Sequence, residues 1–249
     1  MVREGSRVRR ELDRDRRARE VRQTDYLHAM RRHALSICAI AAALSVAACG
    51  RSASSKPATA AEPEPLEHAL SGLSAQHIAV LPTYAVRVMP GLSWGGSVGR
   101  PTDVARTLDA DIVAAFQDKG IGKSWIFPTA LEQAYKRNST YATDPYELAE
   151  EPLRSPSLSV SDRIAEPLAS QLRTLIALHD DVRLVLAPVE MRLEPQGTGG
   201  RGVLRLVLID PRLSNVRWMG EVTSPTEAAF GPVITASIAS KLANVVAAP

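Results

Sequence analysis

Two patterns of apolar residues alternate along the chain from residue 77 onward. Apolar side chains three or four positions apart predict helices over 102–120, 129–137 and 166–180, and a last one through 233–245 with start signals at 224–227. Short apolar runs rich in β-branched residues predict strands over 77–82, 123–128, 182–194, 202–210 and 216–223. The first of these strands can continue through 84–89.

The resulting order, β-α-β-α-α-β-β-β-α, predicts an α/β (α+β) domain in which helices pack on a single mixed sheet. The run 182–194 is almost continuously apolar, which is typical of a central strand buried on both faces. The segment 138–161 is polar and interrupted by prolines. We expect a long irregular loop there, with one helical turn near 146–153.

A different apolar pattern lies ahead of this domain. Residues 34–48 carry no charge, and Arg31 and Arg32 stand just before them. A cationic start followed by about 7–15 apolar residues is typical of a secretory signal peptide. The run is shorter than the roughly 20 apolar residues that a membrane-spanning helix needs. We therefore expect residues 30–48 to direct export.

The apolar run ends in Val-Ala-Ala-Cys at 46–49, which resembles the lipobox of bacterial lipoprotein signal peptides. The resemblance implies cleavage between Ala48 and Cys49 and attachment of a diacylglyceryl group to the Cys49 thiol. Acyl chains such as palmitate then hold the protein on the membrane. In that family an aspartate after the cysteine often retains the protein at the inner membrane. Gly50 stands there, which favours the outer membrane, facing the periplasm. An ordinary signal peptide and an uncut signal anchor are the alternatives.

Residues 1–29 are dense in charges of both signs and poor in core-forming residues. Such a composition buries too little apolar surface to fold. We interpret the segment as a mis-assigned or disordered extension, with Met30 as the true start.

Removal of residues 1–48 changes the charge of the protein. The whole chain has 30 basic and 27 acidic residues, a net charge of +3. The first 48 residues hold 11 arginines and 6 acids, which leaves 19 basic and 21 acidic residues and a charge of −2. Nucleic-acid surfaces need clustered positive charge, so we expect no nucleic-acid partner. Cys38 leaves with the signal, so the mature chain has no disulfide.

The mature chain divides into a tether and one domain. Residues 49–76 contain the lipidated cysteine and a stretch rich in Ala, Ser, Pro and Glu, which predicts a flexible linker. Residues 77–249 then form the single α/β domain. Its length is ample for one hydrophobic core.

Ser93 is the most obvious candidate nucleophile, because Gly-Leu-Ser-Trp-Gly at 91–95 matches G-x-S-x-G. That motif requires a helix directly after the serine, and the following Gly-Ser-Val-Gly-Arg-Pro does not provide one. We expect no catalytic residue here. The remaining histidines lack metal-ligand spacing, so we also expect no metal and no cofactor.

Two other residues are candidates for contact with a partner. Trp94 lies in a glycine-rich loop, and Arg205 interrupts an apolar strand. For Arg205 the alternative is an edge or solvent-side position paired with an acid. Glu150 and Glu151 are adjacent carboxylates in the polar loop, where we expect solvated charges.

Asp210 ends one predicted strand, and Trp218 and Gly220 lie in the next. This arrangement resembles a group of envelope proteins that includes the amino-terminal domain of TolB, LpoB and the curli-secretion lipoprotein. The resemblance covers 77–246, apart from the long loop at 138–161. It implies a non-catalytic accessory protein.

These observations predict a membrane-anchored envelope lipoprotein that serves as a binding or assembly factor for another envelope protein. It is expected to have no enzymatic activity of its own. The alternatives are an envelope hydrolase that uses Ser93 and an oligomeric secretion-channel subunit.

Overall fold

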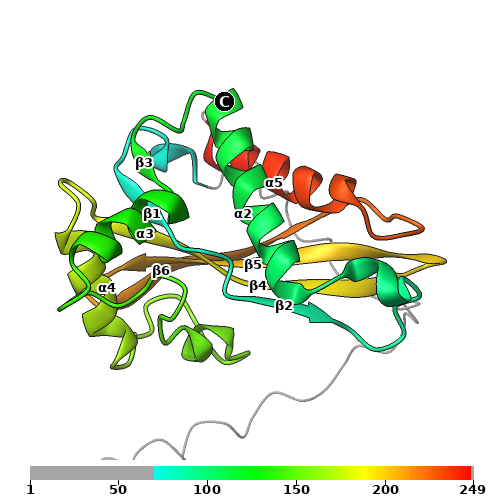
Figure 1. Cartoon of the computed structure of the whole chain (residues 1–249), viewed down its shortest axis with the longest axis horizontal. Coiled ribbons are helices and arrows are strands. Elements are labelled where there is room, and N and C mark those ends of the chain that lie inside the picture. Colours follow the sequence, from blue (N-terminus) through cyan, green and yellow to red (C-terminus); the bar gives the residue numbers. More distant parts are fainter. Residues whose placement is uncertain (1–69, 248–249) are drawn as a thin grey trace, which may run out of the picture. The chain divides into compact units, whose positions relative to one another are not determined.

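The computed structural model of the chain describes residues 70–247 (Figure 1). The signal expected at 30–48, the Ala48–Cys49 cleavage site and the lipidated Cys49 lie outside the described residues, as does the extension at 1–29. No helix in the described part of the chain is both long enough and apolar enough to span a membrane.

A single mixed sheet of six strands forms the centre of the domain, as the sequence predicts. The strands are β1 (Ile78–Val80), β2 (Ala85–Val88), β3 (Trp125–Ile126), β4 (Leu184–Gln196), β5 (Gly199–Asp210) and β6 (Asn215–Thr223). They run in the order β3-β1-β4-β5-β6, and β2 also pairs with β4. Strand β1 pairs in parallel with both β3 and β4, and β2 pairs in parallel with β4. Strands β4, β5 and β6 form the expected antiparallel meander.

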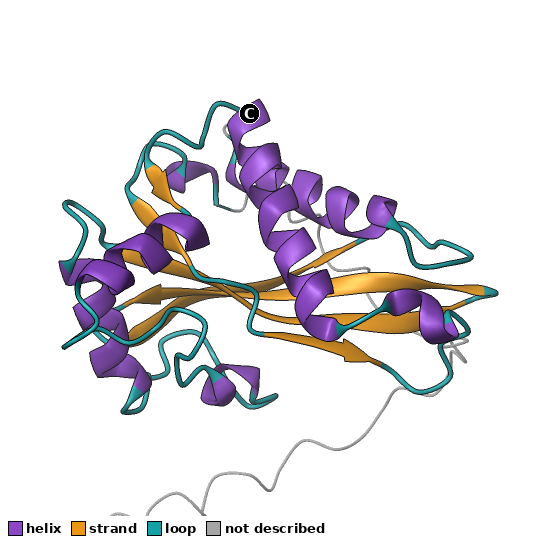
Figure 2. Ribbon diagram, in the orientation of Figure 1, coloured by secondary structure: helices purple, strands orange, loops and turns teal. Residues whose placement is uncertain are grey.

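Four α-helices cover the two faces of this sheet (Figure 2). They are α2 (Pro101–Asp118), α3 (Pro128–Arg137), α4 (Leu168–Ala177) and α5 (Pro232–Val246). Apolar side chains of α2 and α5 join one hydrophobic cluster with one face of the sheet. Those of α3 and α4 join a second cluster on the other face. The expected order of elements is thereby confirmed, with the first strand divided in two.

The division falls between β1 and β2, at residues 81–84. Both short strands pair with β4, and the N–H groups of Leu81 and Tyr84 donate to carbonyls of β4 on either side of the gap. Pro82 has no N–H to donate, and the N–H of Thr83 donates to the side chain of Asp109 instead. Val80 pairs with Leu186 and Ala85 with Glu190, so five residues of the β1–β2 segment span four residues of β4. The pairing with β4 therefore resumes after the gap with its register shifted by one residue.

A β-bulge in β4, between Pro188 and Glu190, lies opposite this gap. Before the bulge, odd-numbered residues such as Val185 belong to the cluster of α3 and α4. After it, odd-numbered residues such as Met191 belong to the cluster of α2 and α5. A bulge shifts the alternation of a strand by one residue. After it, Met191 and Leu193 face the cluster of α2 and α5, and the charged Glu190 and Arg192 lie on the opposite face.

Three segments differ from the expected pattern. The long loop contains a helical turn close to the expected place, the 3-10 helix η3 (Glu151–Arg154), but its Leu148 and Leu153 are buried in the cluster of α3 and α4. Leu70 and η1 (Ser71–Leu73), expected in the linker, pack beside α5, where Leu70 N–H donates to the Val245 carbonyl. Residues 224–227 do not begin a helix, because the N–H and carbonyl of Glu227 bond to Gly200 of β5.

Candidate functional site

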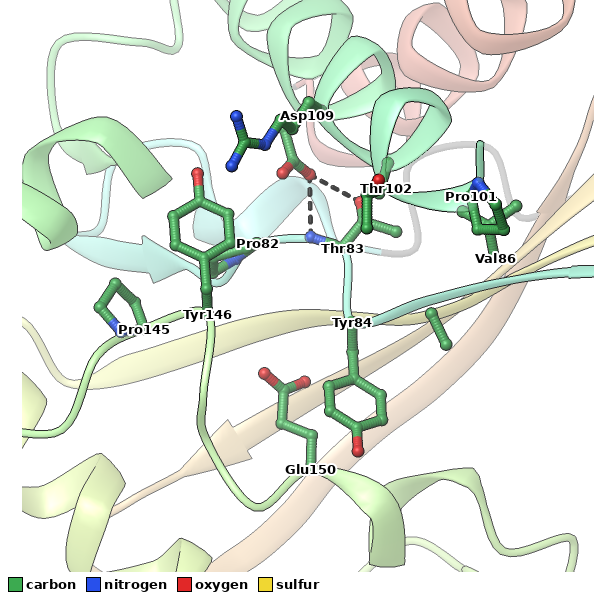
Figure 3. A pocket seen from close by; sticks show the side chains of 13 residues that line it. Pro82, Thr83, Tyr84, Val86, Pro101, Thr102, Asp109, Pro145, Tyr146 and Glu150 are labelled. Carbon is green, nitrogen blue, oxygen red and sulfur yellow. Dashed lines mark hydrogen bonds between the residues drawn. The ribbon is translucent and has the colours of Figure 1, made fainter. Parts of the chain in front are cut away.

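A cavity of about 420 Å³ lies where the first strand is interrupted (Figure 3). Three segments that are far apart in the sequence form its walls: the gap and β2 at 82–86, one face of α2 from Pro101 to Asp109, and the long loop at 145–150. Its volume lies in the range of small-ligand sites, about 300–1,000 Å³.

Asp109 enters the cavity from α2 and is 9% exposed. Its Oδ1 accepts hydrogen bonds from the Thr83 N–H at 2.9 Å and the Thr83 hydroxyl at 2.6 Å. Its Oδ2 is buried and has no hydrogen-bond partner. Burial raises the pKa of Asp109 to about 6, although the hydrogen bonds from Thr83 lower it in part.

Glu150 approaches from the opposite side, on the long loop, and is 1% exposed (Figure 3). Its Oε2 is likewise buried without a hydrogen-bond partner. Burial raises the pKa of Glu150 well above its usual range, and the negative charge of Asp109 raises it further. The expectation of a solvated Glu150 is therefore wrong, because the loop folds onto the sheet and carries this side chain inward.

Two other acids near the cavity, Glu151 and Glu190, form ion pairs with arginines. Glu151 is exposed and pairs with Arg154 at 2.7 Å. The buried Glu190 of β4 pairs with Arg154 at 2.7 Å and with Arg87 at 3.4 Å. The structure thus pairs Glu151 and Glu190 with arginines but leaves Glu150 unpaired. A buried carboxylate without a partner is costly, so such groups usually mark functional sites.

Aromatic and polar side chains surround the two acids. Tyr84 and Tyr146 line the cavity and are 37% and 43% exposed. Burial raises the pKa of both hydroxyls, and Asp109 contributes to the shift of Tyr146. Arg106 of α2 is an exposed lining residue that forms none of the ion pairs in the described part of the chain.

The site offers two hydrogen-bond acceptors, the carboxyls of Asp109 and Glu150, in a half-enclosed cavity. Unpartnered carboxylate oxygens can accept hydrogen bonds from, or neutralise, a cationic group. Among the described residues there is no cluster of three His, Cys, Asp or Glu side chains suited to a metal ion.

Ser93 lies outside this cavity, exposed in the turn between β2 and the short 3-10 helix η2 (Gly95–Val98). None of the hydrogen bonds in the described part of the chain joins it to a histidine or a carboxylate. The helix that a nucleophile elbow needs begins only at Pro101.

Trp94 is 5% exposed and packs inside the domain. Its Nε1–H donates to the Glu227 carbonyl at 3.2 Å, and its ring lies 5.8 Å from that of Phe230. Gly200 leaves room for this ring, because a Cβ there would lie 2.8 Å from a ring carbon. The side chain thus anchors the loop to β5, and its contact with a partner stays a prediction.

Arg205 lies on the sheet face that carries Glu190. Its guanidinium donates to the carbonyls of Arg154 and Ser155, at 3.3 and 2.9 Å. It therefore fastens the long loop to the sheet, rather than pairing with an acid as the alternative expected. Its role in partner contact also stays a prediction.

The sequence pattern did not predict Asp109 as a site residue, and it wrongly predicted a solvated Glu150. Asp109 gives no clear signal because it lies beside the apolar stripe of its helix, next to Leu108. The available signals were weak: Pro82 interrupts an apolar run, and Leu148 and Leu153 on either side of Glu150 are apolar.

Comparisons with known proteins give structural likenesses only. No protein-family model and no curated protein matches the sequence. A dodecameric PelC from Paraburkholderia phytofirmans is 17% identical, with 71% of this chain and 91% of that chain covered and a TM-score of 0.32. The LpoB C-terminal domain from Salmonella enterica is 11% identical, with 62% and 87% covered and a TM-score of 0.33. Lipoprotein GNA1162 from Neisseria meningitidis is 15% identical, with 61% and 80% covered and a TM-score of 0.28. LpoB belongs to the group that the sequence resembles, but similarity at this level carries no conclusion about function.

Proposed function

We propose that this protein is a lipid-anchored envelope lipoprotein that binds another envelope protein and assists its assembly or activity. The lipobox-like residues 46–49 and the linker after them support anchoring at the membrane surface. Lipidation at Cys49 would leave the α/β domain free to reach a partner.

The observation that carries the binding function is the cavity with two unpartnered carboxyls, Asp109 and Glu150. We favour binding over catalysis because one oxygen of each carboxyl is buried without a hydrogen-bond donor. A donor group from a partner would satisfy these acceptors. The cavity is thus better suited to holding a group than to attacking one.

A second candidate function, acid–base hydrolysis, is favoured by the placement of two buried carboxyls, Asp109 and Glu150, in one cavity. Glycoside hydrolases use a pair of carboxyl groups, of which the general acid has a raised pKa. Release of reducing ends from cell-wall glycan by the purified protein, lost in Glu150→Gln, would favour this candidate over binding.

Site-specific photo-crosslinking in the native envelope tests the binding function. A photoreactive phenylalanine at Tyr146, on the cavity rim, should give one discrete adduct with an envelope protein. The same probe at Tyr141, which is 62% exposed and does not line the cavity, is the matched control. Equal adduct patterns from both positions, or no adduct from Tyr146, would contradict the proposal.

A further inference from the structure

We propose that the cavity between α2 and the long loop receives a cationic side chain, a lysine or arginine, from a protein partner. The proposal rests on the proposed binding function and names what the site recognises. Its basis is the burial, pairing and surroundings of Asp109 and Glu150.

The two acids lack partners for their charge. Asp109 and Glu150 are 9% and 1% exposed, and each has a buried oxygen with no hydrogen-bond partner. Such oxygens lose their water without receiving a donor in return. A cation that enters the cavity supplies the missing donors and the missing charge together.

Among the described residues, no cationic side chain forms an ion pair with Asp109 or Glu150. Arg87 pairs with Glu190, and Arg154 pairs with both Glu190 and Glu151. Arg106 lies on the wall of the cavity, but it contributes to neither Asp109 nor Glu150 a hydrogen bond, an ion pair or a pKa shift. The described part of the chain therefore supplies no cation to the two acids, and we infer that a protein partner supplies it.

The walls of the cavity also suit the stem of a lysine or arginine side chain. The walls beside the acids are aromatic and aliphatic: Tyr84, Tyr146, Pro82 and Pro145 (Figure 3). Ring faces attract organic cations, and apolar walls suit the methylene stem that carries the charge of lysine or arginine. An inorganic cation would gain nothing from such walls.

Binding of model side chains tests this inference directly. The full-length protein in mild detergent is titrated with Nα-acetyl-lysine amide and Nα-acetyl-arginine amide by calorimetry and saturation-transfer NMR. We expect dissociation constants of about millimolar, as for other single-group ligands. The norleucine analogue has the same stem without the charge and should bind at least about tenfold more weakly. Equal binding of the norleucine analogue would overturn the proposal.

Variants place the binding in the cavity. Glu150→Gln should weaken binding of the lysine amide at least about tenfold, because it removes an acid while keeping the shape. Glu147→Gln, an exposed acid of the same loop that does not line the cavity, should leave it unchanged. Arg106→Gln should strengthen binding, because it removes a like charge from the wall. Equal losses in Glu150→Gln and Glu147→Gln would show non-specific attraction and would contradict the inference.

Acidification gives an independent readout. Burial raises the pKa values of the Tyr84 and Tyr146 hydroxyls from their ordinary value, which moves them further from the weakly acidic range. The pKa of Asp109 is about 6. Affinity for the lysine amide should therefore fall about tenfold between about pH 7.5 and about pH 5, with a proton released to solvent on binding. A pH-independent affinity would contradict a cation held by these acids.

Failure of this inference is distinguishable from failure of the proposed function. If Tyr146 crosslinks to an envelope protein while no cationic amide binds, the protein is a binding factor with a different ligand in its cavity. If the amide binds but no crosslink forms, the cation site stands and the partner does not dock at this rim.

Discussion

At the residue scale, the fate of each acid depends on whether the fold gives it a partner. Glu190 is buried and receives hydrogen bonds from both Nε and Nη2 of Arg154, at 3.1 and 2.7 Å. Glu150 is buried more completely and receives none at Oε2. Removing one partner of a buried ion pair leaves an uncompensated charge and lowers stability, whereas removing an unpaired buried acid relieves the cost of its desolvation. Substitutions of the two kinds of acid should therefore have opposite effects.

Replacing Asp109 with asparagine should raise the free energy of unfolding at neutral pH by up to about 3 kcal/mol. The asparagine oxygen can still accept both hydrogen bonds from Thr83, while the desolvated charge is removed. Burial raises the pKa of Asp109 from 3.8 to about 6. The folded state therefore loses stability as pH rises from about 4 to about 6, and this loss persists above that range.

Urea unfolding at about pH 4 and about pH 7 measures this effect. Between these two pH values, the contribution of Asp109 lowers the unfolding free energy of the native chain. The Asp109→Asn variant lacks this contribution, so its unfolding free energy should fall less. An unfolding free energy below that of the native chain at both values would indicate a purely structural role for this carboxylate.

Glu190→Gln should have the opposite effect, with a loss of about 1–3 kcal/mol in unfolding free energy near neutral pH. The substitution leaves the guanidinium of Arg154, 22% exposed, without its buried anion. Glu147→Gln is the exposed control and should change stability by less than about 0.5 kcal/mol. Equal stability of Glu190→Gln and Glu147→Gln would show that the ion pair contributes nothing.

At the element scale, two local irregularities create the site. The gap between β1 and β2 removes one strand segment from the sheet, and the bulge at Pro188–Glu190 turns charged residues of β4 toward the long loop. Arg205 and Arg154 then tie that loop to the sheet. Asp210 is one of the residues on which the resemblance to envelope proteins rests, and its role here is structural. Its Oδ1 accepts hydrogen bonds from the N–H groups of Arg212 and Leu213 in the turn before β6.

Gly220→Ala tests how tightly β6 is packed. A Cβ at Gly220 would collide with the ring of Trp218, which lies two residues away on the same face of the strand. We expect a loss of about 1–3 kcal/mol in unfolding free energy and a shift in tryptophan fluorescence. Gly96→Ala, where a Cβ would meet open space, is the control and should change neither. An unchanged Gly220→Ala would mean that the ring is free to move aside.

At the scale of the whole molecule, attachment to the membrane would determine where the cavity can act. The expected anchor, Cys49, lies outside the described residues, so its lipidation rests on the lipobox-like pattern alone. A domain on an extended linker of this composition would search a limited volume near the bilayer for its partner. Loss of the anchor would then lower the effective concentration of the domain near its membrane partner, while the chemistry of the cavity would stay the same.

Cys49→Ser should abolish acylation and move the protein out of the detergent phase in a phase-partition experiment. Cys38→Ser changes the other cysteine, which we expect to leave with the signal, and should have no effect. Mass spectrometry of the native protein should find an acylated Cys49 as its first residue. An unmodified Cys49 thiol, or a start that still includes Arg31 and Arg32, would contradict the proposed anchor.

The sequence by itself determined the order of the elements, the mixed sheet and the long loop, because each depends on the local spacing of apolar, proline and glycine residues. It also contained the pattern on which the anchor is predicted. Only the tertiary structure decided that Asp109 bonds to Thr83, 26 residues away, and that Glu150 faces the same cavity. The spacing of polar residues along a loop does not encode which side chain the loop carries inward. That depends on the strand gap, the bulge and the contacts that hold the loop, which exist only once distant segments have packed together.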